Sequence, residues 1–211
     1  MSSIYLVRHG DYRLEPVDGS GRKFADRGLS ALGRRQADAL RRRLAASPQI
    51  APIVLYTSTL PRALQTAEII ASAYGLQVVA EPDLEEWRSG NDDMPLAEFI
   101  AEWSRMSAFD RRFRRFRPGC ETGIEFDARA RSVLHRIVTQ HAGDCVMIVA
   151  HGGIMEAAFR YFIGLGDGGS SRAYPACGHT SLTHWRRDPD SDEWVLEFLN
   201  DGHHLDGLAA A

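Results

Sequence analysis

The sequence has few cysteines and no long apolar run, and both absences exclude classes of protein. Its three cysteines, Cys120, Cys145 and Cys177, are an odd number at wide spacings. They fit neither a disulfide framework nor a cysteine-based zinc site, so we expect reduced thiols. No run approaches the ~20 apolar residues of a membrane span, and Met1-Ser2-Ser3 leads into an apolar run without the features of a signal peptide. We therefore expect a cytoplasmic protein without a membrane partner.

The chain also has little net charge, −3 at pH 7, which gives no reason to expect a nucleic-acid partner. It contains no internal repeat and no linker-like change in composition, so we expect one domain over residues 1–211. With 44% hydrophobic and 25% charged residues, the composition is that of an ordinary globular protein with a full core. Nothing in it indicates an oligomeric state.

Two apolar runs end in the same pair of residues, a histidine followed by a glycine. Ile4–Val7 is followed by Arg8, His9 and a glycine, and Val146–Ala150 is followed by His151 and two glycines. Short apolar runs bounded by such residues predict buried strands. We expect both histidines to lie at one edge of a sheet and to share a site.

The rest of the chain alternates between strand-like and helix-like segments. We expect strands over 53–57, 77–80 and 145–150, a hairpin of 180–185 and 194–199, and helices from Ser30 to near Pro48, from 58 or 59 onwards, and over 95–117, 121–141 and 152–163. Residues 11–27 have no apolar period and are expected to form a loop. This alternation predicts an α/β protein, a three-layer αβα sandwich with a mostly parallel central sheet and a site at the carboxyl ends of its strands.

The helix that follows the second strand begins with residues suited to bind an anion. Ser58 or Thr59 is expected to cap it, and Pro61 suits its first turn. The first N–H groups of a helix are unpaired and favour negative charge, and Arg62 adds a full positive charge. Two roles remain open for Ser58, that of a helix cap and that of a hydrogen-bond donor to phosphate.

Five segments together resemble the histidine phosphatase superfamily, also called phosphoglycerate-mutase-like. They are Leu6-Val7-Arg8-His9-Gly10, the Leu29-Ser30…Gly33…Gln36-Ala37 helix start, Ser58…Leu60-Pro61-Arg62-Ala63…Gln65-Thr66-Ala67, Leu84…Glu86 and Val149-Ala150-His151-Gly152-Gly153. The resemblance implies the fold of that family, with His9 as the phosphorylated nucleophile and Glu86 as the proton donor. It further implies that Arg8, Arg62 and His151 form the phosphate pocket.

The chemistry of these residues suits those roles without a metal or a cofactor. Two guanidinium groups and an imidazolium can neutralise a phosphomonoester dianion as the phosphoryl group moves. Nearby cations should lower the pKa of His9 and keep it neutral, with a backbone carbonyl fixing its tautomer. A carboxylic acid, Glu86 with Glu85 behind it, can protonate the leaving alkoxide and then take a proton from water.

The sequence departs from the family pattern next to the nucleophile. Asp11-Tyr12-Arg13 stands where many members have an acidic residue and a threonine, so Arg13 or Ser20 is expected to complete the phosphate pocket. Trp87-Arg88-Ser89-Gly90 replaces the usual Gly-x-Trp-Glu-Gly. The other histidines show no metal-ligand spacing, and among them His179 and His204 are expected near the pocket.

We predict a metal-independent phosphomonoester hydrolase that forms a phosphohistidine on His9 and acts on a small phosphorylated metabolite or a phosphoprotein. Two alternatives stay open, a phosphoglycerate mutase-type phosphoryl transferase and a catalytically idle module that binds phosphate or phosphoproteins. A helical, lid-like insertion is expected at about 91–118. Its arginines, from Arg111 to Arg117, either form a solvated basic face or bind a second anionic group of the substrate.

Overall fold

The computed structural model describes residues 1–16, 24–88, 96–165 and 173–208. Its centre is a six-stranded sheet in the order β5-β4-β6-β1-β7-β8. These strands are β1 (Ser3–Arg8), β4 (Val54–Thr57), β5 (Val78–Ala80), β6 (Cys145–Ala150), β7 (Leu182–Arg187) and β8 (Trp194–Asp201). The first four in the sheet order pair in parallel, and β7 and β8 add an antiparallel edge. The predicted α/β class with a mostly parallel sheet is confirmed.

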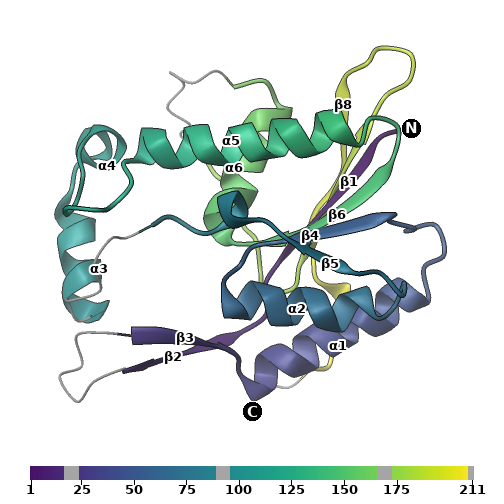
Figure 1. The fold of residues 1–211 in the computed structure, drawn as a ribbon, viewed down its shortest axis with the longest axis horizontal. Helices are drawn as coiled ribbons and strands as arrows, with labels where there is room; N and C mark the ends of the chain where they lie inside the picture. The colour runs from purple at the N-terminus through teal and green to yellow at the C-terminus, as the bar shows by residue number, and fades with distance from the viewer. Residues whose placement is uncertain (17–23, 89–95, 166–172, 209–211) are drawn as a thin grey trace.

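Helices cover both faces of this sheet. Helices α1 (Ala31–Ala45) and α2 (Pro61–Ala71) lie on one face, and α5 (Gly123–Gln140) and α6 (Gly152–Phe162) lie on the other (Figure 1). Within β1, Tyr5 and Val7 belong to the apolar cluster of α1 and α2, whereas Ile4 and Leu6 belong to that of α5 and α6. A strand buried on both faces is apolar at every position, which is why β1 and β6 appear as continuous apolar runs.

The prediction of a loop over residues 11–27 is wrong. Strands β2 (Tyr12–Pro16) and β3 (Phe24–Leu29) pair antiparallel in a separate two-stranded sheet, and residues 17–23 lie outside the described parts of the chain. Residues 13–16 of β2 are all exposed. A ribbon with so little burial imposes no alternation of apolar and polar residues, so its sequence carries no strand signal.

The predicted helix over 95–117 is interrupted. The structure has α3 (Leu96–Arg105) and α4 (Ala108–Phe113) instead, and Ser107 caps α4 by accepting a hydrogen bond from the backbone N–H of Asp110. Serine hydroxyls compete with helical backbone bonds and favour caps, which explains the break. Both helices lie beyond the carboxyl ends of the parallel strands (Figure 1). Residues 91–95 of the predicted insertion lie outside the described residues.

The helix starts are partly as predicted. Ser30 caps α1 by accepting a bond from Gly33 N, and Pro61 is the first residue of α2. The N-cap of α2 is Leu60, however, without a side-chain cap bond, so the prediction of Ser58 or Thr59 as the cap is wrong. Short 3-10 turns are η1 (Pro82–Leu84) and η2 (His203–Leu205). Within the described parts of the chain, every helix is too short or too polar to span a bilayer.

Candidate active site

The carboxyl ends of β1 and β6 bring the two histidine-glycine pairs together. His9 directly follows β1 and donates its backbone N–H to Ala150 O at 2.9 Å. His151 follows Ala150, and the centroids of the two imidazole rings lie 5.1 Å apart. Ser58, just after β4, donates its backbone N–H to Val149 O at 3.2 Å. Parallel pairing therefore gathers three polar residues from distant parts of the chain at one edge.

His9 is held as a neutral imidazole with a defined tautomer. Its side chain is buried, with the residue 3% exposed. Nδ1 lies 2.8 Å from Gly10 O, and Nε2 accepts a hydrogen bond from Arg62 Nε at 3.2 Å. Since a guanidinium can only donate, Nε2 is the unprotonated nitrogen. Burial, followed by the charges of Arg62 and Arg8, lowers the pKa of His9 to about 3. The direction is the predicted one, but burial rather than the cations is the larger cause.

Strands β2 and β3 supply two residues to this site. Asp26 of β3 accepts hydrogen bonds from Arg62 Nη1 at 2.8 Å and from the backbone N–H of Arg62 at 3.3 Å. Tyr12 of β2 lies under the Arg62 guanidinium, 4.6 Å from ring centroid to Cζ, and meets His9 edge-on with centroids 5.2 Å apart. Neither residue was predicted for the site, because both lie in the segment that was expected to be a loop. The one available signal was that Tyr12 replaces the threonine of the family pattern.

His151 is fully buried at the start of α6. Its Nε2 lies 2.8 Å from Ser58 Oγ, which also accepts the backbone N–H of Leu60 at 3.2 Å. Burial and the Arg62 charge lower the pKa of His151 well below its ordinary value. This shift favours the neutral ring over the expected imidazolium. Ser58 can donate to Nε2, which leaves the ring hydrogen on Nδ1.

Two buried donor positions at the start of α6 lack a protein partner within the described residues. They are Arg8 Nε and His151 Nδ1. Arg8 is anchored through Nη1, which donates to Cys177 O at 2.5 Å, and a Cβ built on Gly152 would lie 4.0 Å from Arg8 Nε. Unsatisfied donors beside a helix N-terminus suit the oxygens of an anion.

The Glu86 carboxylate also lies at the start of α6. It follows η1 and accepts hydrogen bonds from the backbone N–H groups of Gly153 at 3.1 Å and Trp87 at 3.0 Å. Glu85 instead accepts hydrogen bonds from Thr59 and Arg88. Of these two glutamates, Glu86 is therefore the one whose carboxylate contacts the same helix start as His151.

Two further histidines, His179 and His204, were expected near the pocket. The ring of His179 is 5.5 Å from that of His9, and burial and the Arg8 charge lower its pKa. His204 Nε2 lies 3.1 Å from Oγ1 of Thr180, whose backbone N–H donates to Arg8 O. Arg13 is exposed on β2, and no contact among the described residues supports its expected place in the pocket. Ser20 lies outside the described residues.

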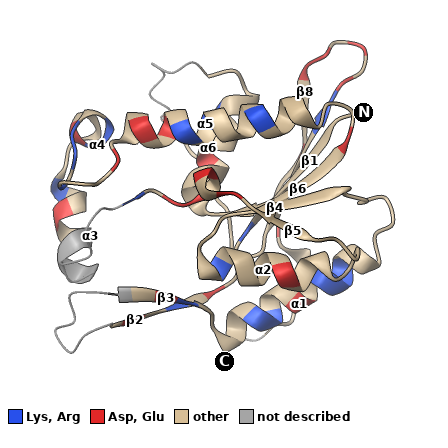
Figure 2. Cartoon of the chain, viewed as in Figure 1, with Lys and Arg blue, Asp and Glu red and all other residues tan. Residues whose placement is uncertain are grey.

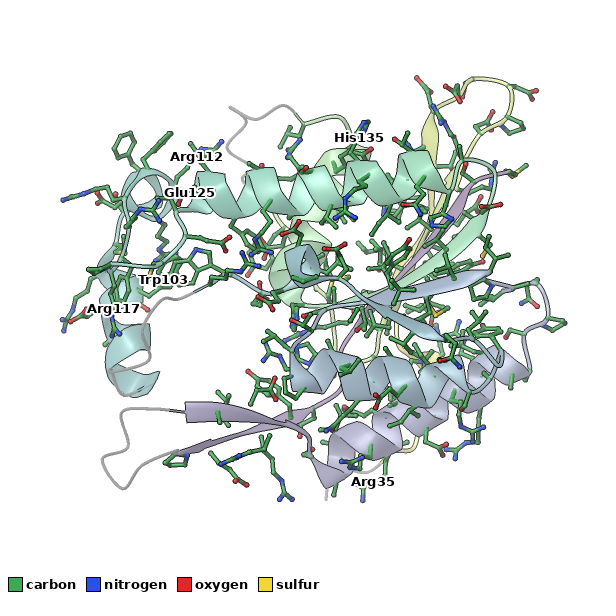
Figure 3. The ribbon with its side chains drawn as sticks, viewed as in Figure 1. Arg35, Trp103, Arg112, Arg117, Glu125 and His135 are labelled. Carbon is green, nitrogen blue, oxygen red and sulfur yellow. The ribbon has the colours of Figure 1, made fainter. Side chains whose placement is uncertain are left out.

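The arginines on α4 and directly after it have partners in their own neighbourhood. Arg114 pairs with Asp110 at 3.1 Å, and Arg115 pairs with Glu125. Arg111 lies over the ring of Trp103, 5.4 Å from its centroid. Figure 2 shows basic and acidic residues interleaved on α4 and the start of α5, and Figure 3 shows Arg112 and Glu125 at the junction of these helices. These contacts favour the interpretation of a solvated basic face.

Comparison with known proteins agrees with this geometry. Residues 4–202 match the family model of the histidine phosphatase superfamily (branch 1). The chain is 31% identical to a probable phosphoglycerate mutase, GpmB, of Yersinia enterocolitica, over 98% of this chain and 96% of that protein. It is 26% identical to the metal-independent phosphoserine phosphatase of Arabidopsis thaliana, over 99% and 85% of the two chains.

A solved structure supports the same assignment. YhfR of Bacillus stearothermophilus superposes with a TM-score of 0.72 and 25% identity, covering 97% of this chain and all (100%) of that one. The chain belongs to the histidine phosphatase superfamily. Of the two relatives compared by sequence, one is named as a probable mutase and the other as a phosphatase.

Proposed function

We propose that this protein is a metal-independent phosphomonoester hydrolase that acts on small phosphorylated molecules through a phosphohistidine on His9. The observation that carries the proposal is the unprotonated Nε2 of His9, buried between Arg62 and His151. A neutral imidazole with a free lone pair is the form that can attack phosphorus. Arg8, Arg62 and the N-terminus of α6 supply positive charge for the phosphoryl oxygens, so this step needs no metal.

In the first step, the lone pair of His9 Nε2 forms a bond to phosphorus while the bond from phosphorus to the leaving oxygen breaks. The electron pair of that bond goes to the leaving oxygen, which takes a proton from the Glu86 carboxyl group. Arg62 and Arg8 donate to the phosphoryl oxygens, and His151 donates through Nδ1. The product is an alcohol and a phosphohistidine.

In the second step, water attacks phosphorus and gives a proton to the Glu86 carboxylate. The bond between phosphorus and Nε2 breaks, and its electron pair returns to the ring. Inorganic phosphate leaves, and the initial protonation states are restored. The same carboxylate thus serves as acid and then as base.

The named relatives support a small phosphorylated substrate. One is a metal-independent phosphoserine phosphatase, which favours hydrolysis. The probable phosphoglycerate mutase favours phosphoryl transfer as the second candidate. The two reactions differ in whether water or a second substrate takes the phosphoryl group from His9, so the fate of the phosphoenzyme distinguishes them.

The test is turnover of p-nitrophenyl phosphate in the presence of EDTA by the wild type, His9→Ala and His135→Ala. His135 is a matched control. It lies on α5 (Figure 3), and its Nδ1 contacts the Tyr161 hydroxyl at 3.1 Å. We expect turnover and an acid-labile, alkali-stable phospho-adduct in the wild type and in His135→Ala. His9→Ala should lose both.

Three outcomes would contradict the hydrolase. Stoichiometric phosphate binding without turnover would indicate a binding module. A phosphoenzyme that survives in water and discharges only to phosphoglycerate would indicate a mutase. Turnover that EDTA abolishes and added metal restores would exclude the metal-independent step.

A further inference from the structure

The segment that carries Glu86 is held by one buried arginine of α5. Arg129 Nη1 donates to Asp83 O at 2.7 Å and to Glu85 O at 2.9 Å, and Nη2 donates to Glu86 O at 3.3 Å. Nε and Nη2 also donate to the two carboxylate oxygens of Glu121, at 2.6 and 2.7 Å. An arginine has five N–H groups, and these five bonds engage all of them.

Glu121 holds the same segment from its other end. Its Oε2 accepts the backbone N–H of Arg88 at 2.9 Å, and its backbone carbonyl accepts the indole N–H of Trp87 at 2.8 Å. Its own backbone N–H donates to Arg88 O at 2.9 Å. The Arg129 and Glu121 side chains are only 9% and 14% exposed, so water competes little for these bonds.

These contacts act on the backbone on both sides of Glu86, whereas the carboxylate itself is held by Gly153 and Trp87. Fixing three carbonyls over four residues fixes the position from which the Glu86 side chain reaches the start of α6. A lysine could keep the charge of Arg129 but offers three donors from one nitrogen, without the planar fork that spans Glu121 and the carbonyls.

We propose that Arg129, with Glu121, is a positioning residue that places Glu86 for proton transfer to the leaving group. The inference rests on the proposed hydrolase, in which Glu86 is the proton donor. Within the described residues, the hydrogen bonds of Arg129 go to Glu121 and to three backbone carbonyls, and none goes to Arg8, Arg62 or His151. Its effect should therefore depend on how much the leaving group needs a proton.

The experiment measures kcat/KM for a series of phosphomonoesters that runs from p-nitrophenyl phosphate through phenyl phosphate to an alkyl phosphate. Glu86→Gln should steepen the dependence on leaving-group basicity, because the basic alkoxide loses its acid. Arg129→Lys should steepen it in the same sense, with a loss of about 10–100-fold for the alkyl ester, as expected for a displaced catalytic group, and less than about threefold for p-nitrophenyl phosphate.

Two further variants make the result decisive. Arg131→Lys is the matched control, since Arg131 lies on the same helix and pairs with Asp127 at 2.8 Å; it should leave the dependence unchanged. Glu121→Gln preserves the shape of the side chain and should show the same steepening in a milder form. It provides the test if Arg129→Lys folds poorly. In a Glu86→Gln background, Arg129→Lys should add no further steepening.

Each outcome decides between the possibilities. Two results would overturn the positioning role and leave the proposed hydrolase unaffected. In one, Arg129→Lys and Glu121→Gln each lower kcat/KM equally for all esters. In the other, Arg129→Lys lowers kcat/KM for the alkyl ester equally in the wild-type and Glu86→Gln backgrounds. Absence of turnover by the wild type would overturn the hydrolase and this inference with it.

Discussion

Asp26 is predicted to stabilise the protein by compensating the buried charge of Arg62. Their side chains are 10% and 11% exposed and meet at 2.8 Å. Replacing Asp26 by Asn keeps the shape but leaves the guanidinium without a counter-charge. Breaking a buried pair from one side costs about 3–5 kcal/mol. We expect the lower end, about 3 kcal/mol, because an amide oxygen can still accept from Arg62. This is a large part of a typical unfolding free energy of about 5–15 kcal/mol.

Urea denaturation at pH 7 measures the loss, with Asp38→Asn as the control. Asp38 pairs with Arg41 and Arg42 on the surface of α1 and is 38% exposed, so its neutralisation should cost no more than about 1 kcal/mol. Inorganic phosphate should stabilise Asp26→Asn more than the wild type, since the anion supplies the missing charge. Equal losses in the two variants, or equal stabilisation by phosphate, would refute this account of Asp26.

Two further predictions follow from the neutral histidine and from the start of α6. The folded pKa of His9 is about 3, below the ordinary value of about 6.5, so the unfolded chain binds the proton first. The contribution of the neutral His9 ring to the free energy of unfolding is fully present above pH 6.5 and is lost as the pH falls toward 3. Between pH 7 and pH 4, His9→Gln should therefore lose about 3 kcal/mol less unfolding free energy than the wild type; equal losses would contradict the buried neutral ring. In Gly153→Ala, the new Cβ would lie 2.3 Å from Glu86 Oε1, whereas in Gly152→Ala the nearest atom is Arg8 Nε at 4.0 Å. Only the first should lower kcat/KM for an alkyl phosphate, by about 100-fold, and similar rates for both would show that Glu86 is not displaced or does not act.

The central sheet was predictable because strands that are buried on both faces have apolar residues at every position. Residues 4–7 and 146–150 are apolar throughout, since each faces one helical layer or the other. Strands β2 and β3 were not predictable, because β2 is largely exposed and its pairing rests on backbone bonds that any residue can make. The role of Asp26 on β3 was not predictable for the same reason.

The site was predictable only in part. The meeting of His9 with His151 follows from parallel strands that end at one edge of a sheet. The lowered pKa of His151 was not predictable, because its complete burial depends on residues from distant elements. The contacts of Arg129 with Asp83 O, Glu85 O and Glu86 O could not be predicted either. Every residue has a backbone carbonyl, so the sequence does not indicate which carbonyls accept a hydrogen bond from a side chain.

The hydrogen bond from Arg62 Nε to His9 Nε2 has a consequence for selectivity in the proposed reaction. The lone pair of His9 Nε2 that would attack phosphorus accepts this N–H at 3.2 Å and is therefore engaged by the guanidinium. When a phosphoryl oxygen accepts this N–H in place of His9 Nε2, the lone pair becomes free to attack. Binding of the phosphate and activation of the nucleophile therefore occur together. An uncharged electrophile has no anionic oxygen to accept the Arg62 N–H. The N–H therefore stays on His9 Nε2, and the imidazole remains unable to attack.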